Sequence, residues 1–290
     1  MFPVAICVAT CAMLSGIGGA ALFTPIFVLI FPLLGPEYVL ESTLAAIAAA
    51  LITQTFGFLS GFVGYYRRGL IDYSIAWRFI RIAVPVTLLG VWVANAVHES
   101  VLLASYSILI TLMAISLWWR SSMHADAGHS AKTGIITTIV DSRGHEYRYP
   151  RPKMAFRNFA LTSAGAFLTG MVSVGLGEVT ISQLTRKTIP IAVAAATSVM
   201  IVSVTVLFAS STHAVQLIQH GGWSAVPWDL LVWDIPGVLI GGQIGPRLQG
   251  LISQKTMQHV IAILFVVLAV AMLFVAEQKA GLSILGTTNV

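Results

Sequence analysis

Long apolar stretches that are almost free of charge recur along this chain, and they restrict what it can fold into. The stretches are residues 38–66, 82–97, 101–119, 158–185, 189–219, 230–246 and 257–276. A helix needs about 18 or more such residues to cross the hydrocarbon core of a bilayer. Hydrophobic residues make up 57% of the chain and charged residues only 9%, whereas an ordinary soluble domain carries about 25% charged residues. The sequence therefore predicts an all-α polytopic membrane protein.

One polar stretch, residues 121–156, interrupts this pattern. Within it, Thr137–Val140 and Glu146–Tyr149 flank a turn sequence that contains Asp and Gly, which predicts a small β-hairpin. His124, Asp126 and His129 match no ligand spacing typical of a metal site, so we interpret the rest of the stretch as a solvated linker. The predicted organisation is a first transmembrane repeat (1–120), this loop (121–156), a second transmembrane repeat (157–279) and a C-terminal tail (280–290).

The two transmembrane parts resemble each other. Each begins with a glycine cluster, continues with a hydroxyl pair and a long apolar run, and ends with a glycine-rich segment and a final apolar run. The clusters are Gly16–Gly19 and Gly175–Glu178, and the hydroxyl pairs are Ser42-Thr43 and Thr197-Ser198. Internal duplication is typical of transporters, whose substrate site lies where the repeats meet.

The placement of positive charge favours one of two topologies. Segments 3–34 and 158–185 each have glycines near the middle, so each is either a long broken helix or a hairpin of two half-helices. If both are hairpins, 15 of the 16 Lys and Arg residues lie on the cytoplasmic side and only Lys279 lies outside, as the positive-inside rule prefers. Each half then has an odd number of crossings, and the halves are inverted relative to each other.

Helices that begin in mid-membrane leave backbone N–H groups without partners and carry a partial positive charge at that end. Half-helices beginning near Ala20 and Val179 would therefore form a cradle for a small anion. The alternative is that the glycines only allow close helix packing. The residues that we predict to bind the substrate are Gly16, Gly18, Gly19, Ser42, Thr43, Gly175, Gly177, Gln183, Thr197 and Ser198, with the amide of Gln54 as a further donor.

Glu178 interrupts the second glycine cluster inside an apolar segment, where ionisable groups are costly and usually functional. Its carboxylate would compete with an anionic substrate for the helix end and would leave when protonated, so it is the main candidate for proton coupling. The alternative is a carboxylate that only caps the helix. Glu41 is a weaker coupling candidate, while His213 and Asp234 are expected to be packed or solvated polar residues.

These residues together resemble the TauE/SafE sulfite exporter family. The resemblance rests on Gly16–Gly19 with Pro25, Glu41-Ser42-Thr43, Tyr66–Tyr73, Gly175–Gly177, Ala196-Thr197-Ser198 and Gly241–Gly245, and it covers the chain outside the central loop. It implies a carrier in a bacterial-type plasma (inner) membrane that exports sulfite or related organosulfur anions. The chain departs from the family pattern at Ala20 and Ala21, at Glu178 and at Leu184. These departures fall on the predicted binding tips, where they can change which anion is bound.

The sequence thus favours a secondary transporter for small anions, with protons and the lipid bilayer as its other partners. The basic isoelectric point reflects loop charge and does not indicate nucleic-acid binding. Neither a phosphate-binding loop nor a His-Glu-x-x-His or Gly-x-Ser-x-Gly motif occurs, so we expect no enzyme, no cofactor and no metal. An anion channel is the alternative, and an intramembrane enzyme is a more distant one.

Overall fold

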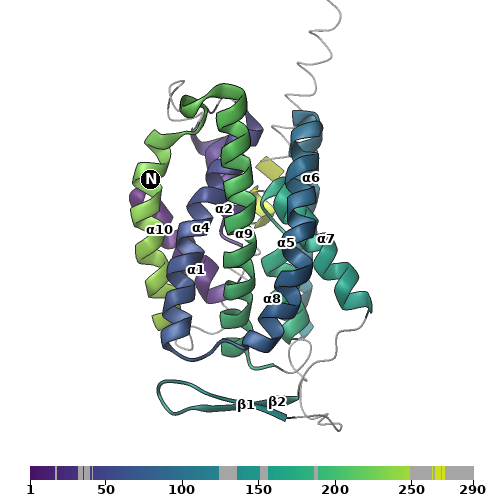
Figure 1. Ribbon diagram of the computed structural model, residues 1–290, viewed down its shortest axis with the longest axis vertical. Helices are drawn as coiled ribbons and strands as arrows, with labels where there is room; N and C mark the ends of the chain where they lie inside the picture. The colour runs from purple at the N-terminus through teal and green to yellow at the C-terminus, as the bar shows by residue number, and fades with distance from the viewer. Residues whose placement is uncertain are drawn as a thin grey trace, which may run out of the picture.

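A computed structural model describes residues 1–16, 18–31, 35, 40, 42–123, 136–150, 156–185, 189–248, 263, 265–268, 270 and 271, with the backbone alone at 114 and 116–123. The chain is mostly helical, as predicted (Figure 1). The helices are α1 (Phe2–Ser15), α2 (Ala20–Pro25), the π-helix η1 (Ile26–Ile30), α4 (Thr43–Arg67), α5 (Tyr73–Ala96), α6 (Glu99–Met123), α7 (Phe156–Val172), α8 (Leu176–Thr185), α9 (Ile191–Gly221), the 3₁₀-helix η3 (Trp223–Ala225) and α10 (Trp228–Leu248).

Within the part of the chain that the structure describes, three helices are long and apolar enough, by length and composition, to cross a membrane: Thr43–Arg67, Tyr73–Ala96 and Ile191–Gly221. Their starts follow from local sequence. Ser42 caps α4 by accepting a hydrogen bond from the N–H of Ala45, and Asp72 caps α5 by accepting one from Ile75. α9 begins directly after Pro190, which cannot donate a backbone hydrogen bond.

Glycine lets two sets of helices approach closely. α10 packs along α1 through Gly237, Gly241 and Gly245, where an added Cβ would overlap the facing helix. α5 packs on α7 through Gly90 and Gly170, whose neighbours are backbone atoms of the opposite helix. Small residues of this kind are typical of helix contacts in membranes.

The central helices α4 and α9 run antiparallel. Thr55 bonds to the oxygen atoms of Ser210 and Val206, and the hydroxyl of Ser203, earlier in α9, donates to the carbonyl of Phe58, later in α4. α10 runs beside α4 in the same direction, because Gly57 lies against Val238 and Gly64 against Pro246.

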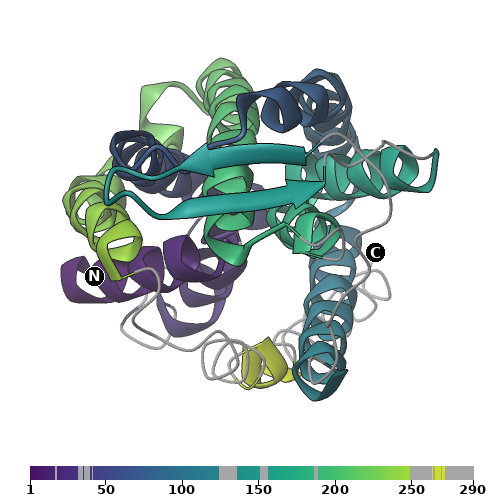
Figure 2. The same ribbon diagram turned by 90° about the horizontal axis from the view of Figure 1, so that it is seen from below.

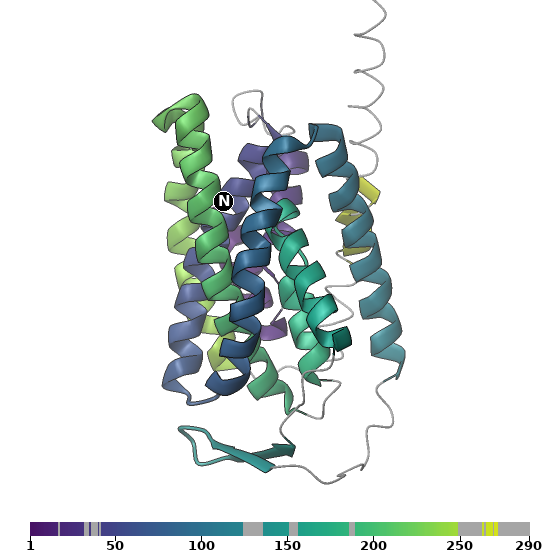
Figure 3. The same cartoon turned by 45° about the vertical axis from the view of Figure 1, so that its right-hand side comes forward.

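The predicted β-hairpin is present. β1 (Ile136–Val140) pairs antiparallel with β2 (Glu146–Pro150), and the register joins Val140 to Glu146 around the predicted turn. The hairpin lies across one end of the helical bundle (Figures 2 and 3). It is held there by two hydrogen bonds: the N–H of Ser142 donates to the carbonyl of Arg68, and the hydroxyl of Tyr149 donates to Asp72 Oδ2 at 2.8 Å.

Candidate functional site

Both glycine-containing segments are broken helices, as the sequence predicts. α1 ends at Ser15, and Gly16 follows in the left-handed region with a φ of 68°, which favours glycine. α2 begins at the predicted Ala20, four residues further on. The segment then turns back along α4, since Gly19 lies beside Phe58 and Ala20 beside Gln54, nearer the start of that helix.

The second break lies slightly earlier than the sequence predicts. α7 ends at Val172, Ser173 and Gly175 take positive φ values of 65° and 134°, and α8 begins at Leu176. Gly177 is therefore in the first turn of α8, and the predicted start near Val179 is wrong. The reason is that Glu178 Oε2 accepts a hydrogen bond from the N–H of Gly175 at 3.1 Å, a capping arrangement that begins the helix before the glutamate.

α8 folds back along α7. Near the end of α8, the amide nitrogen of Gln183 donates to the carbonyl of Asn158 at 3.3 Å and to the hydroxyl of Thr162 at 3.2 Å. Asn158 is in the first turn of α7, so the segment 156–185 returns to the level at which it began. This is the geometry of a helical hairpin rather than of a single broken crossing.

The two breaks meet inside the bundle. Thr24 in α2 and Ser173 at the second break share a hydrogen bond of 2.9 Å between their hydroxyl oxygens. A Cβ on Gly18 would lie 3.6 Å from Glu178 Oε1, and one on Gly16 would lie 3.2 Å from Ile181 in α8. The hydroxyl of Ser198 in α9 donates to the carbonyl of Gly16 at 3.3 Å. The structure therefore brings together five of the predicted residues: Gly16, Gly18, Gly175, Glu178 and Ser198.

Glu178 occupies the space between the breaks. It is 7% exposed, Oε2 caps α8, and Oε1 faces Gly18 without a hydrogen bond of good geometry from the residues that the structure describes. The backbone N–H of Leu176 is bonded to the hydroxyl of Thr169. A carboxylate thus caps the end of the half-helix at which an anion is predicted to bind.

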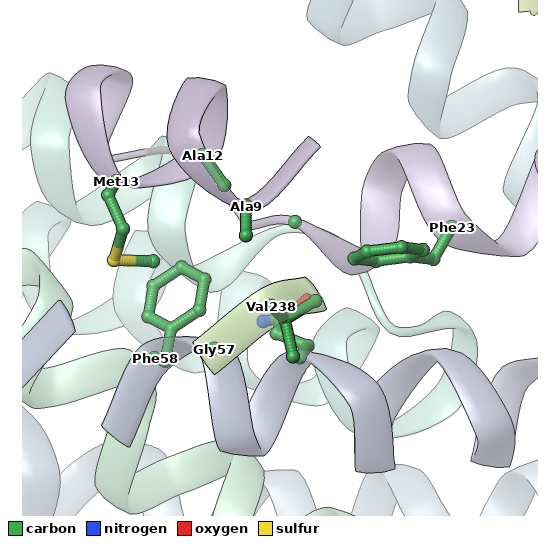
Figure 4. A pocket seen from close by; sticks show the side chains of 9 residues that line it. Ala9, Ala12, Met13, Phe23, Gly57, Phe58 and Val238 are labelled. Carbon is green, nitrogen blue, oxygen red and sulfur yellow. The ribbon is translucent and has the colours of Figure 1, made fainter. Parts of the chain in front are cut away.

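Gln54 accepts a hydrogen bond at the start of α2, as Glu178 does at the start of α8. Its side-chain oxygen accepts a hydrogen bond from the N–H of Ala20, and a Cβ on Gly18 would lie 3.7 Å from its amide nitrogen. Gln54 also lines a small hollow (Figure 4). The residues around the hollow are Ala9, Ala12, Met13, Gly19, Phe23, Gln54, Gly57, Phe58 and Val238. Apart from Gln54, the residues that line it are apolar.

Other predicted site residues have partners elsewhere. Ser42 caps α4, and the backbone and hydroxyl of Thr43 both donate to Glu99 Oε1 at the start of α6. Thr197 accepts a hydrogen bond from the N–H of Asp72, close to the β-hairpin. Glu41 lies outside the described residues, so its predicted role stays a prediction.

Four further polar residues bond at or beside the two breaks, and no sequence pattern predicts them: Thr24, Thr169, Ser173 and Tyr106. Tyr106 is fully buried and its hydroxyl donates to the carbonyl of Ala21 at 2.8 Å, which fixes α2 from α6. Ser173, the one non-glycine residue with positive φ among those described, has no sequence signal. The described residues contain no group of three or more His, Cys, Asp or Glu side chains that could hold a metal.

The apolar helices and the two helix breaks that meet between them are typical of a multi-pass membrane protein. The family model "Sulfite exporter TauE/SafE" matches residues 1–272, and the chain belongs to that family. The chain is also similar to the "Probable membrane transporter protein YunE" of Bacillus subtilis (strain 168), at 23% identity over 230 residues that cover 79% of this chain and 80% of the relative. No solved structure matches the chain significantly.

Proposed function

We propose that the protein is a proton-coupled secondary transporter that exports small anions, of the sulfite or organosulfonate kind, by alternating access between two inverted repeats. The helix contacts support the inversion. α4 and α9 hold equivalent places in the two halves and run antiparallel. The first-half α1 packs on the second-half α10, and the second-half α7 packs reciprocally on the first-half α5. If the two halves are related by a two-fold axis in the membrane plane, every contact between a helix of one half and a helix of the other has a counterpart with the halves exchanged. The contacts of α1 with α10 and of α7 with α5 are such a pair.

The orientation follows from the charges. Arg67 and Arg68 lie beside the β-hairpin, Arg68 contacts the carbonyl of Pro246 next to Arg247, and the hairpin adds Arg143 and Arg148. The sequence between residues 189 and 246, which includes the opposite end of α9, carries no Lys or Arg. By the positive-inside rule, the hairpin end faces the cytoplasm. Membership of the TauE/SafE family supports a bacterial-type plasma (inner) membrane as the location.

The position of Glu178 carries the proposal for the substrate site. An ionised carboxylate that caps a half-helix and faces the opposite break fills the place that a small anion would take. When Glu178 takes up a proton, it loses the negative charge that is attracted to the positive N-terminal end of α8. The backbone N–H groups at that end then become available to the substrate. Binding of the anion and of the proton are then positively linked, so the two cross in the same direction, and an outward gradient of the anion drives its export together with a proton.

Purified protein in proteoliposomes tests this proposal with sulfite, thiosulfate, short sulfonates and carboxylates, with and without a pH gradient. We expect saturable transport of sulfur-containing anions that a pH gradient accelerates when the compartment holding the anion is the more acidic one. Glu178→Gln keeps a capping oxygen but cannot ionise, so transport should lose its dependence on the gradient. The matched control is Glu146→Gln on the exposed hairpin. If Glu178→Gln keeps the wild-type pH dependence, the coupling role is wrong, and flux that does not saturate indicates a channel.

Labelling of single cysteines tests the topology in a Cys7→Ala, Cys11→Ala background. A cysteine at Ser142 should react only from the cytoplasmic side, and one at Gly221, at the far end of α9, only from the outside. Cytoplasmic labelling at Gly221 contradicts the inverted arrangement.

A further inference from the structure

A second buried carboxylate lies in α10, away from the helix breaks. Asp234 has no exposed surface, and neither of its carboxylate oxygens has a hydrogen-bond partner among the described residues. The sequence suggests a packed or solvated residue here, and the structure buries it among packed helices, away from bulk water. A buried polar group without a partner is rare in folded proteins and calls for a physical account.

A buried hydroxyl lies at the same level of the neighbouring helix. Val238 in α10 packs against Gly57 in α4, and both Asp234 and Thr53 lie one helical turn before these residues. Thr53 is also fully buried, and its hydroxyl oxygen has no partner in the described part of the chain. Gly237, three residues after Asp234, packs on Phe2 and Ala5, so the carboxyl group lies where α10 faces both α1 and α4.

Few charges are available to neutralise Asp234. From α1 the charged group that faces it is the amino group of Met1, which forms no ion pair with it. α4 contributes no charged side chain until Arg67, at the opposite end of that helix. An ionised carboxylate with neither ion pair nor hydrogen bond is strongly unfavourable in a protein interior, and protonation removes that penalty.

We propose that Asp234, which lies in α10 at the level of the buried Thr53 hydroxyl in α4, is a second proton-binding site, separate from Glu178. Its role in transport rests on the function proposed above. α10 packs on α1, which leads into the first break, and on α4, which carries Gln54. When the bundle opens between α10 and these helices, water reaches Asp234 and the proton leaves; when it closes, the carboxyl group must be protonated again. The site therefore couples proton binding to the closed packing of α10.

Thermal unfolding of the purified protein, measured from about pH 5 to about pH 9, tests proton binding without any transport assay. Asp234→Asn mimics the protonated acid in shape and cannot ionise. If the folded protein holds a proton that the unfolded chain releases, the wild type loses stability with rising pH relative to this variant. Asp229→Asn, an exposed carboxylate on the same helix, should follow the wild-type curve. Thr53→Val should fall between the wild type and Asp234→Asn.

Three results overturn the site. The first is that stability falls equally with pH in the wild type and in Asp234→Asn, and the second is that Asp234→Asn does not fold. The third is that Na⁺ at constant pH stabilises the wild type alone. In proteoliposomes, Asp234→Asn should retain anion exchange at equal pH and lose accumulation driven by a pH gradient. If the wild type transports no anion at all, the function proposed above fails, while the unfolding curves still decide whether Asp234 binds a proton.

Discussion

Replacing Gly90 by alanine tests whether close packing of α5 on α7 holds the second break in place. A Cβ on Gly90 would lie closer than 3.0 Å to the carbonyl oxygen of Phe167, and backbone atoms cannot rotate away as a side chain can. The helices must therefore separate by roughly 1 Å, which weakens the neighbouring contacts by about a quarter to a half. Separation also strains the 2.8 Å hydrogen bond from Thr87 to the carbonyl of Ala166.

The expected magnitude follows from these terms. Overpacking costs about 1–3 kcal/mol. The hydrogen bond adds about 1 kcal/mol to that cost, and the better helix propensity of alanine offsets about 1 kcal/mol. We expect Gly90→Ala to reduce the free energy of unfolding by about 1–3 kcal/mol, or about 2–4 °C in Tm for each kcal/mol in a chain of this size. Because α7 leads directly into the break, transport should fall as well.

Gly61→Ala is the matched control. A Cβ there meets a similar overlap, but with the sulfur of Met13, the flexible end of a side chain that can move aside. We therefore expect its Tm to stay close to that of the wild type in the same thermal-unfolding assay in detergent. A Gly61→Ala loss as large as that of Gly90→Ala, or an unchanged Gly90→Ala protein, refutes the argument that backbone contact decides the cost.

Three further predictions concern the hairpin and the contact between the breaks. Tyr149→Phe removes the bond to Asp72 and should loosen the hairpin by about 1 kcal/mol, measured as faster hydrogen exchange in residues 136–150. Burial raises the pKa of Asp141, but backbone N–H bonds within its turn outweigh this and hold the pKa below its usual value. The turn should therefore stay ordered at neutral pH and loosen only on acidification below the usual aspartate range, which NMR can follow; loss of order near neutral pH contradicts this. Thr24→Val and Ser173→Ala each break the bond between the breaks, so a double-mutant cycle on stability should give a coupling of about 0.5–1.5 kcal/mol, and additive losses exclude the contact.

Local patterns explain what could be predicted from the sequence. The helix breaks were predictable because Gly16 needs a left-handed backbone that other residues resist, and an ionisable residue beside Gly175–Gly177 stands out in an apolar run. The β-hairpin was predictable because its turn and its strands are adjacent in sequence. The analogy between the halves assigns Ser42, Thr43 and Thr197 to the substrate. In the structure Ser42 caps its own helix, while Thr43 and Thr197 bond to Glu99 and Asp72, which lie far away along the chain.

The sequence by itself determined that this is a helical membrane protein with two broken helices and a β-hairpin between two similar halves, because hydropathy and glycine conformation act over short distances. Tertiary structure alone decided that Glu178 of the second half faces Gly18 of the first half. It also decided that Asp234 is buried where α10 packs against α1 and α4. Both depend on which helix faces lie together. That follows from packing between segments more than 100 residues apart, which no local pattern records.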